Sequence, residues 1–197
     1  MDDPSVPGPA GVEREPRSDA ATDELGGVNQ FELIDEREAG GRPARIGGRR
    51  WSELGAAVVT AVGVTEPWTA TLRFVDSGAM AELNREYLGG DGPTDVLSFP
   101  IDGPDAMVDP TPPSAGSPPL MLGDLVICPA WAEANAPDHA GTADDEMALL
   151  VVHGVLHLLG MDHADDDERL AMQARERDLL ARLYGPLSRD PWVGSWS

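Results

Sequence analysis

The chain has 197 residues, of which 41% are hydrophobic, and this length and composition are typical of one globular domain with a buried core. It has 14 basic residues, all of them arginine, and 35 acidic residues, which gives a net charge of −21. Such acidity argues against nonspecific binding to nucleic acids or anionic membranes. No apolar stretch is long enough to cross a bilayer, and the lone cysteine, Cys128, excludes an intrachain disulfide and a cysteine-based zinc site. We therefore expect a soluble, cytoplasmic protein.

The first half of the chain predicts a terminal extension followed by alternating strands and helices. Residues 1–28 are acidic and rich in proline and glycine, which predicts a disordered extension. A single domain is expected over residues 29–185, and its first strand near 30–35. Apolar residues at helical spacing predict a helix over 51–62, and alternating β-formers predict a strand over 68–75. Asp76 or Ser77 can cap a further helix that runs to about Tyr87.

The second half predicts two more strands and three more helices. TDVLSFP predicts a strand over 94–100, and the proline-rich segment 102–119 predicts a long loop. A strand over 120–128 and a short helix opened by Pro129 follow. Helices are expected over 143–159 and from the acidic run at 165–168 to about Tyr184. Residues 186–197 form a C-terminal tail, in which we interpret Trp192 and Trp196 as part of a frayed end, with docking of a partner as the alternative. The fold class is α+β, with a small mixed β-sheet of about four strands packed with helices.

Three of the four histidines fall in the segment VVHGVLHLLGMDH, with the spacing H-x3-H-x5-H. Residues four apart lie on one face of a helix, so His153 and His157 can point at a common metal ion. Gly160 can take the left-handed conformation that ends a helix, which would let His163 reach the same point. Three neutral nitrogens leave the fourth position of a tetrahedral zinc ion open to water. The pattern therefore predicts a catalytic zinc site whose reactive group is a zinc-bound water.

The same spacing occurs in the metzincin proteases, whose pattern is H-E-x-x-H-x-x-G-x-x-H. The helix is thus metzincin-like, but Gly154 stands where those proteases have the glutamate that serves as general base. Peptide hydrolysis needs a proton delivered to a poor amine leaving group, so the loss of this glutamate weighs against a protease. A metzincin-like peptidase is therefore an alternative and not the main hypothesis.

Four separated motifs together resemble the YbeY family of bacterial endoribonucleases and rRNA maturation factors. In chain order they are LNREY at 83–87, TDVLSFP at 94–100, LGD at 122–124 and HGVLHLLGMDH at 153–163. The resemblance covers about residues 30–184. It implies a single-strand-specific, metal-dependent endoribonuclease that acts on the small ribosomal subunit in rRNA 3′-end maturation and ribosome quality control. It also implies one zinc ion per chain, held by His153, His157 and His163.

One departure from the family concerns the arginine that commonly follows the aromatic residue of the LNxxY motif, where this chain has Leu88. Arg85 lies three residues earlier on the same helical face and is the candidate catalytic arginine, although a plain surface arginine is the favoured interpretation. No arginine or lysine occurs from Glu86 to Glu168, which predicts weak intrinsic affinity for RNA. Recognition would then depend on ribosomal proteins, an assembly GTPase or the pre-ribosome. A noncatalytic ribosome-assembly factor with a structural zinc ion is a further alternative.

Five other polar residues are weaker candidates for the site. Asp162 could accept a hydrogen bond from a ligand histidine or could serve only in a turn. Asp124 and Ser98 would border a substrate groove, and Asp95 would organise a turn. His139 is interpreted as a loop histidine that does not bind the metal.

Overall fold

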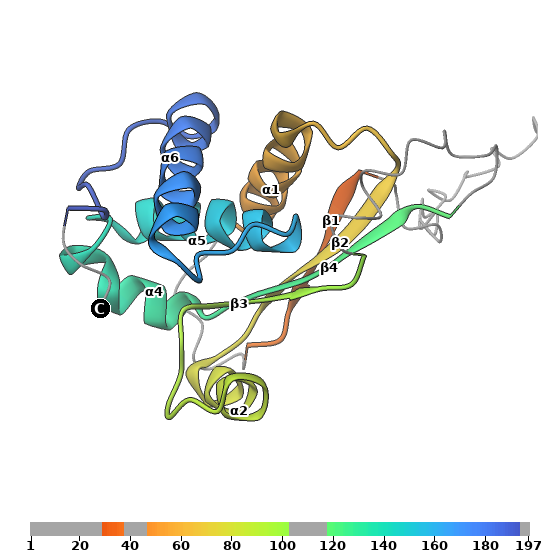
Figure 1. The fold of residues 1–197 in the computed structure, drawn as a ribbon. Helices are drawn as coiled ribbons and strands as arrows, with labels where there is room; N and C mark the ends of the chain where they lie inside the picture. The colour runs from red at the N-terminus through yellow and green to blue at the C-terminus, as the bar shows by residue number, and fades with distance from the viewer. Residues whose placement is uncertain (1–28, 38–46, 103–117, 194–197) are drawn as a thin grey trace, which may run out of the picture.

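The computed structural model describes residues 29–37, 47–102 and 118–193 (Figure 1). The predicted extension over residues 1–28, most of the predicted loop over 102–119, and Trp196 lie outside these ranges. Within them the chain folds as an α+β domain with a mixed sheet, which confirms the predicted fold class. None of the described helices is long and apolar enough to cross a membrane.

The sheet has four strands in the order β1-β2-β4-β3. Strands β1 (Gln30–Asp35), β2 (Trp68–Phe74) and β4 (Leu120–Ile127) run parallel, and β3 (Val96–Pro100) pairs antiparallel with β4 at the edge. The alternating residues of β2 are the reason it forms a strand, because every second side chain enters the core. The buried set is Trp68, Ala70, Leu72 and Phe74.

Helices cover both faces of the sheet (Figure 1). One face carries three of them, namely α1 (Gly48–Val62), α5 (Ala143–Leu158) and α6 (Asp166–Leu183). The other face carries α2 (Ser77–Leu88), whose Met80 packs in a small second cluster with Leu97, Val126 and Cys128. A short helix, α4 (Pro129–Asn135), and the 3-10 turn η1 (Ala136–Asp138) lead from β4 to α5.

The helix starts follow from side chains that accept hydrogen bonds from the first turn. Asp76 accepts from the Ala79 N–H at the start of α2, and Asp165 accepts from the Glu168 N–H at the start of α6. Thr142 does the same for α5. Each cap satisfies a backbone donor that the helix itself leaves without a partner. Asp76 therefore caps α2, and the acidic run at 165–168 lies at the start of α6, as the sequence predicted.

Two elements begin two or more residues away from their predicted starts. Strand β3 begins at Val96 and not at Thr94, because Asp95 Oδ1 accepts the Val96 N–H at 2.8 Å and the Thr94 hydroxyl at 3.1 Å. Asp95 thus organises a turn, as predicted. Helix α1 begins at Gly48, three residues earlier than predicted, after Gly47 in the left-handed conformation with φ 61°.

The described part of the C-terminal tail is packed on the domain, so the interpretation of Trp192 as part of a frayed end is wrong. The Arg189 N–H donates to the Ala140 carbonyl at 3.0 Å, and the Ser188 N–H donates to Asp145 Oδ2 at 3.1 Å. The Trp192 indole N–H donates to Glu176 Oε2 at 2.8 Å. These bonds are nonlocal, which is why the local composition of the tail did not reveal them.

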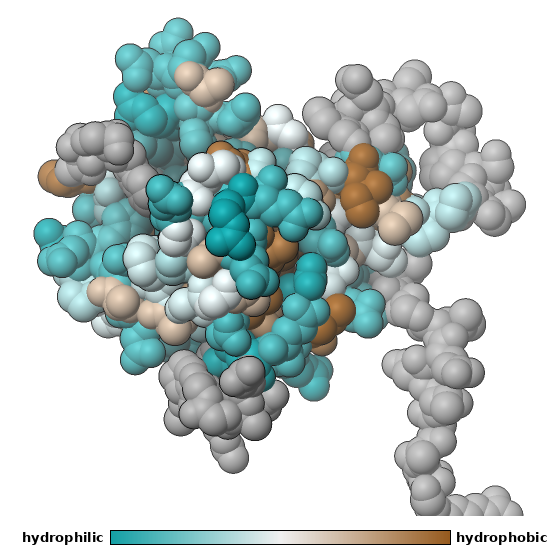
Figure 2. All heavy atoms as spheres, turned by 90° about the horizontal axis from the view of Figure 1, so that it is seen from below, coloured by the Kyte–Doolittle hydropathy of each residue, from teal (hydrophilic) through white to brown (hydrophobic). Residues whose placement is uncertain are grey.

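The face that carries α2 is mostly hydrophilic, with hydrophobic residues in separate spots (Figure 2). Single exposed apolar residues are ordinary on protein surfaces, so this face gives no reason to expect a docking surface. The polar chemistry of interest lies on the opposite side of the sheet, on α5 and α6.

Candidate metal centre

Helix α5 presents His153 and His157 at its one polar edge. Apart from these two histidines, its residues from Asp145 to Leu158 are all buried. The two rings lie one turn apart, with centroids 4.6 Å apart and with their Nε2 atoms 3.2 Å apart. An apolar helix thus holds two ring nitrogens side by side, at the place where the sequence predicted a pair of ligands.

Gly160 turns the chain back so that His163 joins this pair. Its φ of 84° lies in the left-handed region, and its N–H donates to the His157 carbonyl at 2.9 Å as the helix ends. The ring centroid of His163 lies 4.9 Å from that of His157 and 5.6 Å from that of His153. Asp162 Oδ1 accepts the backbone N–H of His163 at 2.7 Å, so the bond that the structure shows for Asp162 stabilises the turn.

The three histidines fit a metal ion. Each offers one nitrogen, and these three nitrogens all lie within 4.8 Å of one another. Two nitrogens bound at about 2.0–2.1 Å to a tetrahedral zinc ion lie about 3.3 Å apart, which matches the spacing of the two helical ligands. The donor set is also that of a site with three protein ligands and one open position.

The protonation state of His157 suits a ligand. Burial, together with the positive charges that His153 and His163 can carry, lowers the pKa of His157 from 6.5 to about 4. At neutral pH the ring is therefore uncharged, and a nitrogen lone pair is available to a cation.

Glu176, on α6, contacts the candidate site and was not predicted from the sequence. Its side chain is 4% exposed, and its Oε1 lies 2.7 Å from Nδ1 of His153. A carboxylate at this distance accepts the Nδ1–H and so leaves Nε2 as the nitrogen that faces the other histidines. The available signal was its position four residues after the buried Met172 and three before the buried Leu179, which puts a charged residue on the apolar stripe of α6.

A cavity of about 180 Å³ opens beside the histidines, between α5 and α6. Both His153 and His163 line it, and Arg169 is the one basic residue among its described lining residues apart from histidine. The Arg169 guanidinium lies 2.7 Å from the carboxylate of Asp166, which is almost fully exposed. Arg169 was not singled out in the sequence, because the run of acids around it reads as a solvated helix start.

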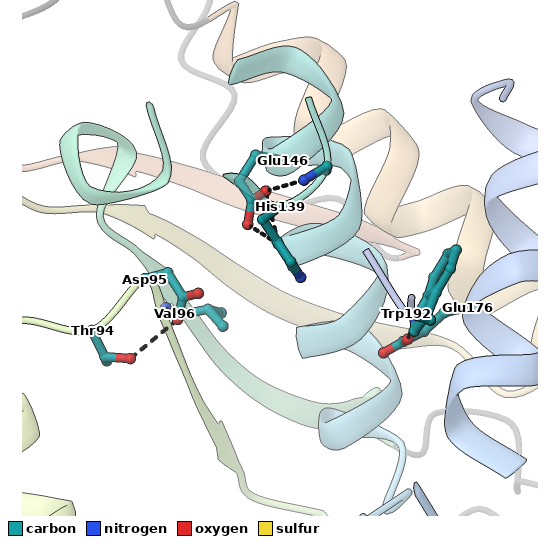
Figure 3. Close-up of polar contacts among 8 residues, drawn as sticks. Thr94, Asp95, Val96, His139, Glu146, Glu176 and Trp192 are labelled. Carbon is teal, nitrogen blue, oxygen red and sulfur yellow. Dashed lines mark hydrogen bonds and ion pairs between the residues drawn. The ribbon is translucent and has the colours of Figure 1, made fainter. Parts of the chain in front are cut away.

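His139 also lines this cavity, although it does not belong to the group of three histidines. Its Nδ1 lies 2.8 Å and 2.9 Å from the two carboxylate oxygens of Glu146, which is 1% exposed (Figure 3). Glu146 Oε2 also accepts the Ala140 N–H at 3.1 Å. His139 is thus a loop histidine outside the ligand set, as predicted, but it is held rigidly at the wall of the cavity.

Comparison with known proteins identifies the family. The family model described as Endoribonuclease YbeY matches residues 48–184. The chain belongs to the YbeY family. Relatives named endoribonuclease YbeY include one from Salinispora tropica, 45% identical over 131 residues, which covers 65% of this chain and 82% of the relative. Another, from Pseudomonas entomophila, is 43% identical over 145 residues, with 74% of this chain and 82% of the relative covered.

A solved structure has a similar fold. The solution structure of TM1509 from Thermotoga maritima aligns with a TM-score of 0.51 at 24% sequence identity, over 78% of this chain and 90% of that one. At this level of identity, the likeness bears on the fold alone.

The sheet explains why this YbeY family member has Gly154 where a metzincin has glutamate. A Cβ atom at Gly154 would collide with Leu125 Cδ1 and lie 3.1 Å from Ser98 Oγ, so α5 approaches the sheet more closely than any side chain would allow. The Ser98 hydroxyl donates to the Gly154 carbonyl at 3.1 Å, so a hydrogen bond links β3 to α5. Residue 154 therefore faces the sheet, where a glutamate has no room.

The other candidates lie farther from the histidines in the fold. Arg85 and Leu88 belong to α2, on the opposite face of the sheet from α5, and Arg85 is not among the described residues that line the cavity. Leu88 is exposed. Asp124 lies on β4, in register with Phe99 of β3. The structure thus brings the three histidines together and leaves Arg85 and Asp124 outside the cavity.

Proposed function

We propose that this protein is a zinc-dependent endoribonuclease that cuts single-stranded RNA, in maturation of the 3′ end of small-subunit rRNA and in late-stage ribosome quality control in the cytoplasm. The observation that carries the proposal is the convergence of His153, His157 and His163 in a chain of the YbeY family. Relatives that share up to 49% of their aligned residues with this chain are named endoribonuclease.

The histidines would hold one zinc ion per chain, and a zinc ion so held supplies Lewis acidity for hydrolysis of a phosphodiester. Glu176 fixes the tautomer and orientation of His153 through the 2.7 Å contact. The attacking group is a water molecule or the 2′-hydroxyl of the RNA. The largely buried helix under the site keeps the ligand nitrogens in place during the reaction.

The arginine that contacts the phosphate is Arg85 or Arg169. The first is the sequence-based substitute for the family arginine that Leu88 replaces, and the second lines the cavity beside His153 and His163. The variants Arg85→Gln and Arg169→Gln each remove one charge from a helix and are matched controls for one another. Loss of a charge-assisted bond to phosphate should lower kcat/KM about tenfold or more, because such bonds contribute about 1.5–3 kcal/mol. The variant with the larger loss identifies the residue.

The net charge of −21 supports recognition through partners and not through the chain's own charge. We place ribosomal proteins, an assembly GTPase or the small ribosomal subunit in this role, since basic partners would offset the repulsion between an acidic protein and RNA. Leu88 stands where the family commonly has an arginine, and this favours one second candidate function, a noncatalytic ribosome-assembly factor that keeps the zinc ion for structure.

The test uses a labelled single-stranded RNA that spans a small-subunit rRNA 3′ precursor, incubated with intact, chelated and zinc-restored protein. We expect cleavage that chelation abolishes and zinc restores, and none of a fully double-stranded version of the same RNA. Stoichiometric zinc without any cleavage, on the RNA or on the precursor subunit, would favour the assembly factor.

A further inference from the structure

The cavity beside the metal centre has the size of a single aromatic ring. Its volume is about 180 Å³, and it lies between α5, α6, the start of β3 and the C-terminal segment. A cavity of about 150 Å³ engineered in another protein holds one benzene ring. There is thus room for a six-membered ring with its attached oxygen and nitrogen atoms, but little beyond it.

The walls of the cavity combine apolar surfaces with a few polar groups. The apolar residues are Val96, Leu149, Leu150, Met172 and Trp192. The polar residues include Asp95, His139 and Gln173. A nucleobase has two apolar faces and a polar edge, so this combination is the one that a base requires. Two acidic side chains of the lining, Asp95 and Glu176, disfavour a phosphate within the cavity, and the one arginine among its described lining residues, Arg169, remains the candidate contact to the phosphate beside it.

Trp192 is fixed before any ligand arrives. Its indole N–H donates to Glu176 Oε2 at 2.8 Å, and the Arg177 guanidinium lies 4.4 Å from the ring centroid. An aromatic ring held on a rigid wall is the usual platform on which an unpaired base stacks. The same carboxylate contacts His153, so this platform is connected directly to a predicted metal ligand.

Asp95 is fixed on the other side of the cavity. Its Oδ1 accepts the Val96 N–H and the Thr94 hydroxyl, and in Figure 3 Asp95 and Trp192 lie on opposite sides of His139. A carboxylate accepts well from the exocyclic amine of cytosine, and the amide of Gln173 can donate to or accept from either pyrimidine.

Taking the proposed endoribonuclease function as given, we propose that this cavity binds the base of a pyrimidine nucleotide next to the phosphate that is cut. Trp192 lies against the face of the base, and Asp95 and Gln173 contact its edge. The chain thus selects its cleavage position by base, although its acidic surface offers the RNA backbone little attraction.

The test measures binding and cleavage separately. Fluorescein-labelled 2′-O-methyl pentamers of adenosine, with cytosine, uracil, adenine or guanine at the centre, are titrated with zinc-loaded protein and followed by anisotropy. Ribose pentamers of the same sequences are used for cleavage. We expect the cytosine and uracil pentamers to bind roughly tenfold more tightly than the purine pentamers, because one ring fits and two fused rings do not.

The variants separate stacking from support of the metal ligand. Trp192→Ala should weaken binding of the pyrimidine pentamers roughly 5- to 100-fold and remove the preference. Trp192→Phe loses the same N–H to Glu176 but keeps a ring, so it should retain the preference. Trp131→Ala is the control, since Trp131 is an exposed residue of α4 outside the cavity walls. Zinc content is measured for each variant.

The failure of this proposal is distinct from the failure of the nuclease function. Equal affinity for all four pentamers overturns the base pocket even if the protein cuts RNA. Pyrimidine-selective binding without any cleavage of the ribose pentamers or the rRNA precursor supports the pocket and overturns the nuclease function. Absence of binding to every pentamer overturns the pocket as well.

Discussion

Glu176→Gln is the change that tests the metal centre most directly without removing a ligand. The Glu176 carboxylate accepts two hydrogen bonds, from His153 Nδ1 at 2.7 Å and from Trp192 Nε1 at 2.8 Å. A glutamine has nearly the same shape but only one accepting oxygen. Its amide NH2 must therefore face one of the two donors, and either the orientation of His153 or the position of Trp192 is lost.

The size of the effect follows from these contacts. Loss of the partner of a ligand histidine typically lowers metal affinity about 10- to 100-fold. If the free zinc concentration is 1,000 times the Kd of the wild type, zinc stabilises the wild type by about 4.1 kcal/mol. At the same free zinc concentration, a site that binds 30-fold more weakly is stabilised by about 2 kcal/mol less. A buried donor without a partner lowers the free energy of unfolding by about 1–3 kcal/mol in addition, with or without zinc.

The assay combines a zinc competition titration against a chromogenic chelator with urea unfolding in the presence and absence of zinc. Glu133→Gln, an exposed residue of α4, carries the same charge change away from the site and should behave as the wild type. If Glu176→Gln kept the zinc affinity of the wild type, the contact between Glu176 and His153 would not orient the ligand, and the reasoning would be wrong.

Three further changes test the site and its support. His157→Ala should bind less than stoichiometric zinc by elemental analysis and lose the chelator-induced drop in Tm, since it removes a ligand from within α5. Gly154→Ala should lower the free energy of unfolding by about 1–3 kcal/mol in urea, because the added Cβ collides with Leu125. Burial raises the pKa of Asp145, but hydrogen bonds with Ser188, Thr142 and Tyr184 outweigh it and hold the pKa below 3.8. The stability that the Asp145 carboxylate contributes is therefore fully present above pH 3.8 and is lost as pH falls through the lowered pKa. The difference in unfolding free energy between the wild type and Asp145→Asn should thus be constant above pH 3.8 and shrink below it.

Local spacing predicted that the three histidines come together, because the geometry of a helix determines which residues share a face. His153 and His157 are one turn apart in any α-helix, and Gly160 is suited to the turn that brings His163 back. The strands and helices were predicted for the same reason, from periodicity and capping residues. The order of the strands in the sheet, in contrast, does not follow from any local pattern.

The support around the ligands was not predicted, because it depends on contacts between segments far apart in the chain. Glu176 lies 23 residues from His153, and Trp192 lies 16 residues beyond Glu176. The absence of a glutamate at Gly154 was evident in the sequence, but its cause, the close approach of α5 to Leu125, was not. In each case the role of the residue follows from packing between distant segments, namely of α6 on α5, of the C-terminal segment on α6, and of α5 on the sheet.

The three histidines differ in burial and in the element that carries them, and this bears on how the proposed metal ion would enter and leave. His153 and His157 are half-buried on a rigid helix, whereas His163 is exposed on the turn that follows Gly160. Exposed turns open at far lower free energy than buried helices do. We expect the ion to exchange through transient detachment of His163 while the other two ligands stay in place. Amide hydrogen exchange should then accelerate in the turn, and not in α5, when zinc is withdrawn.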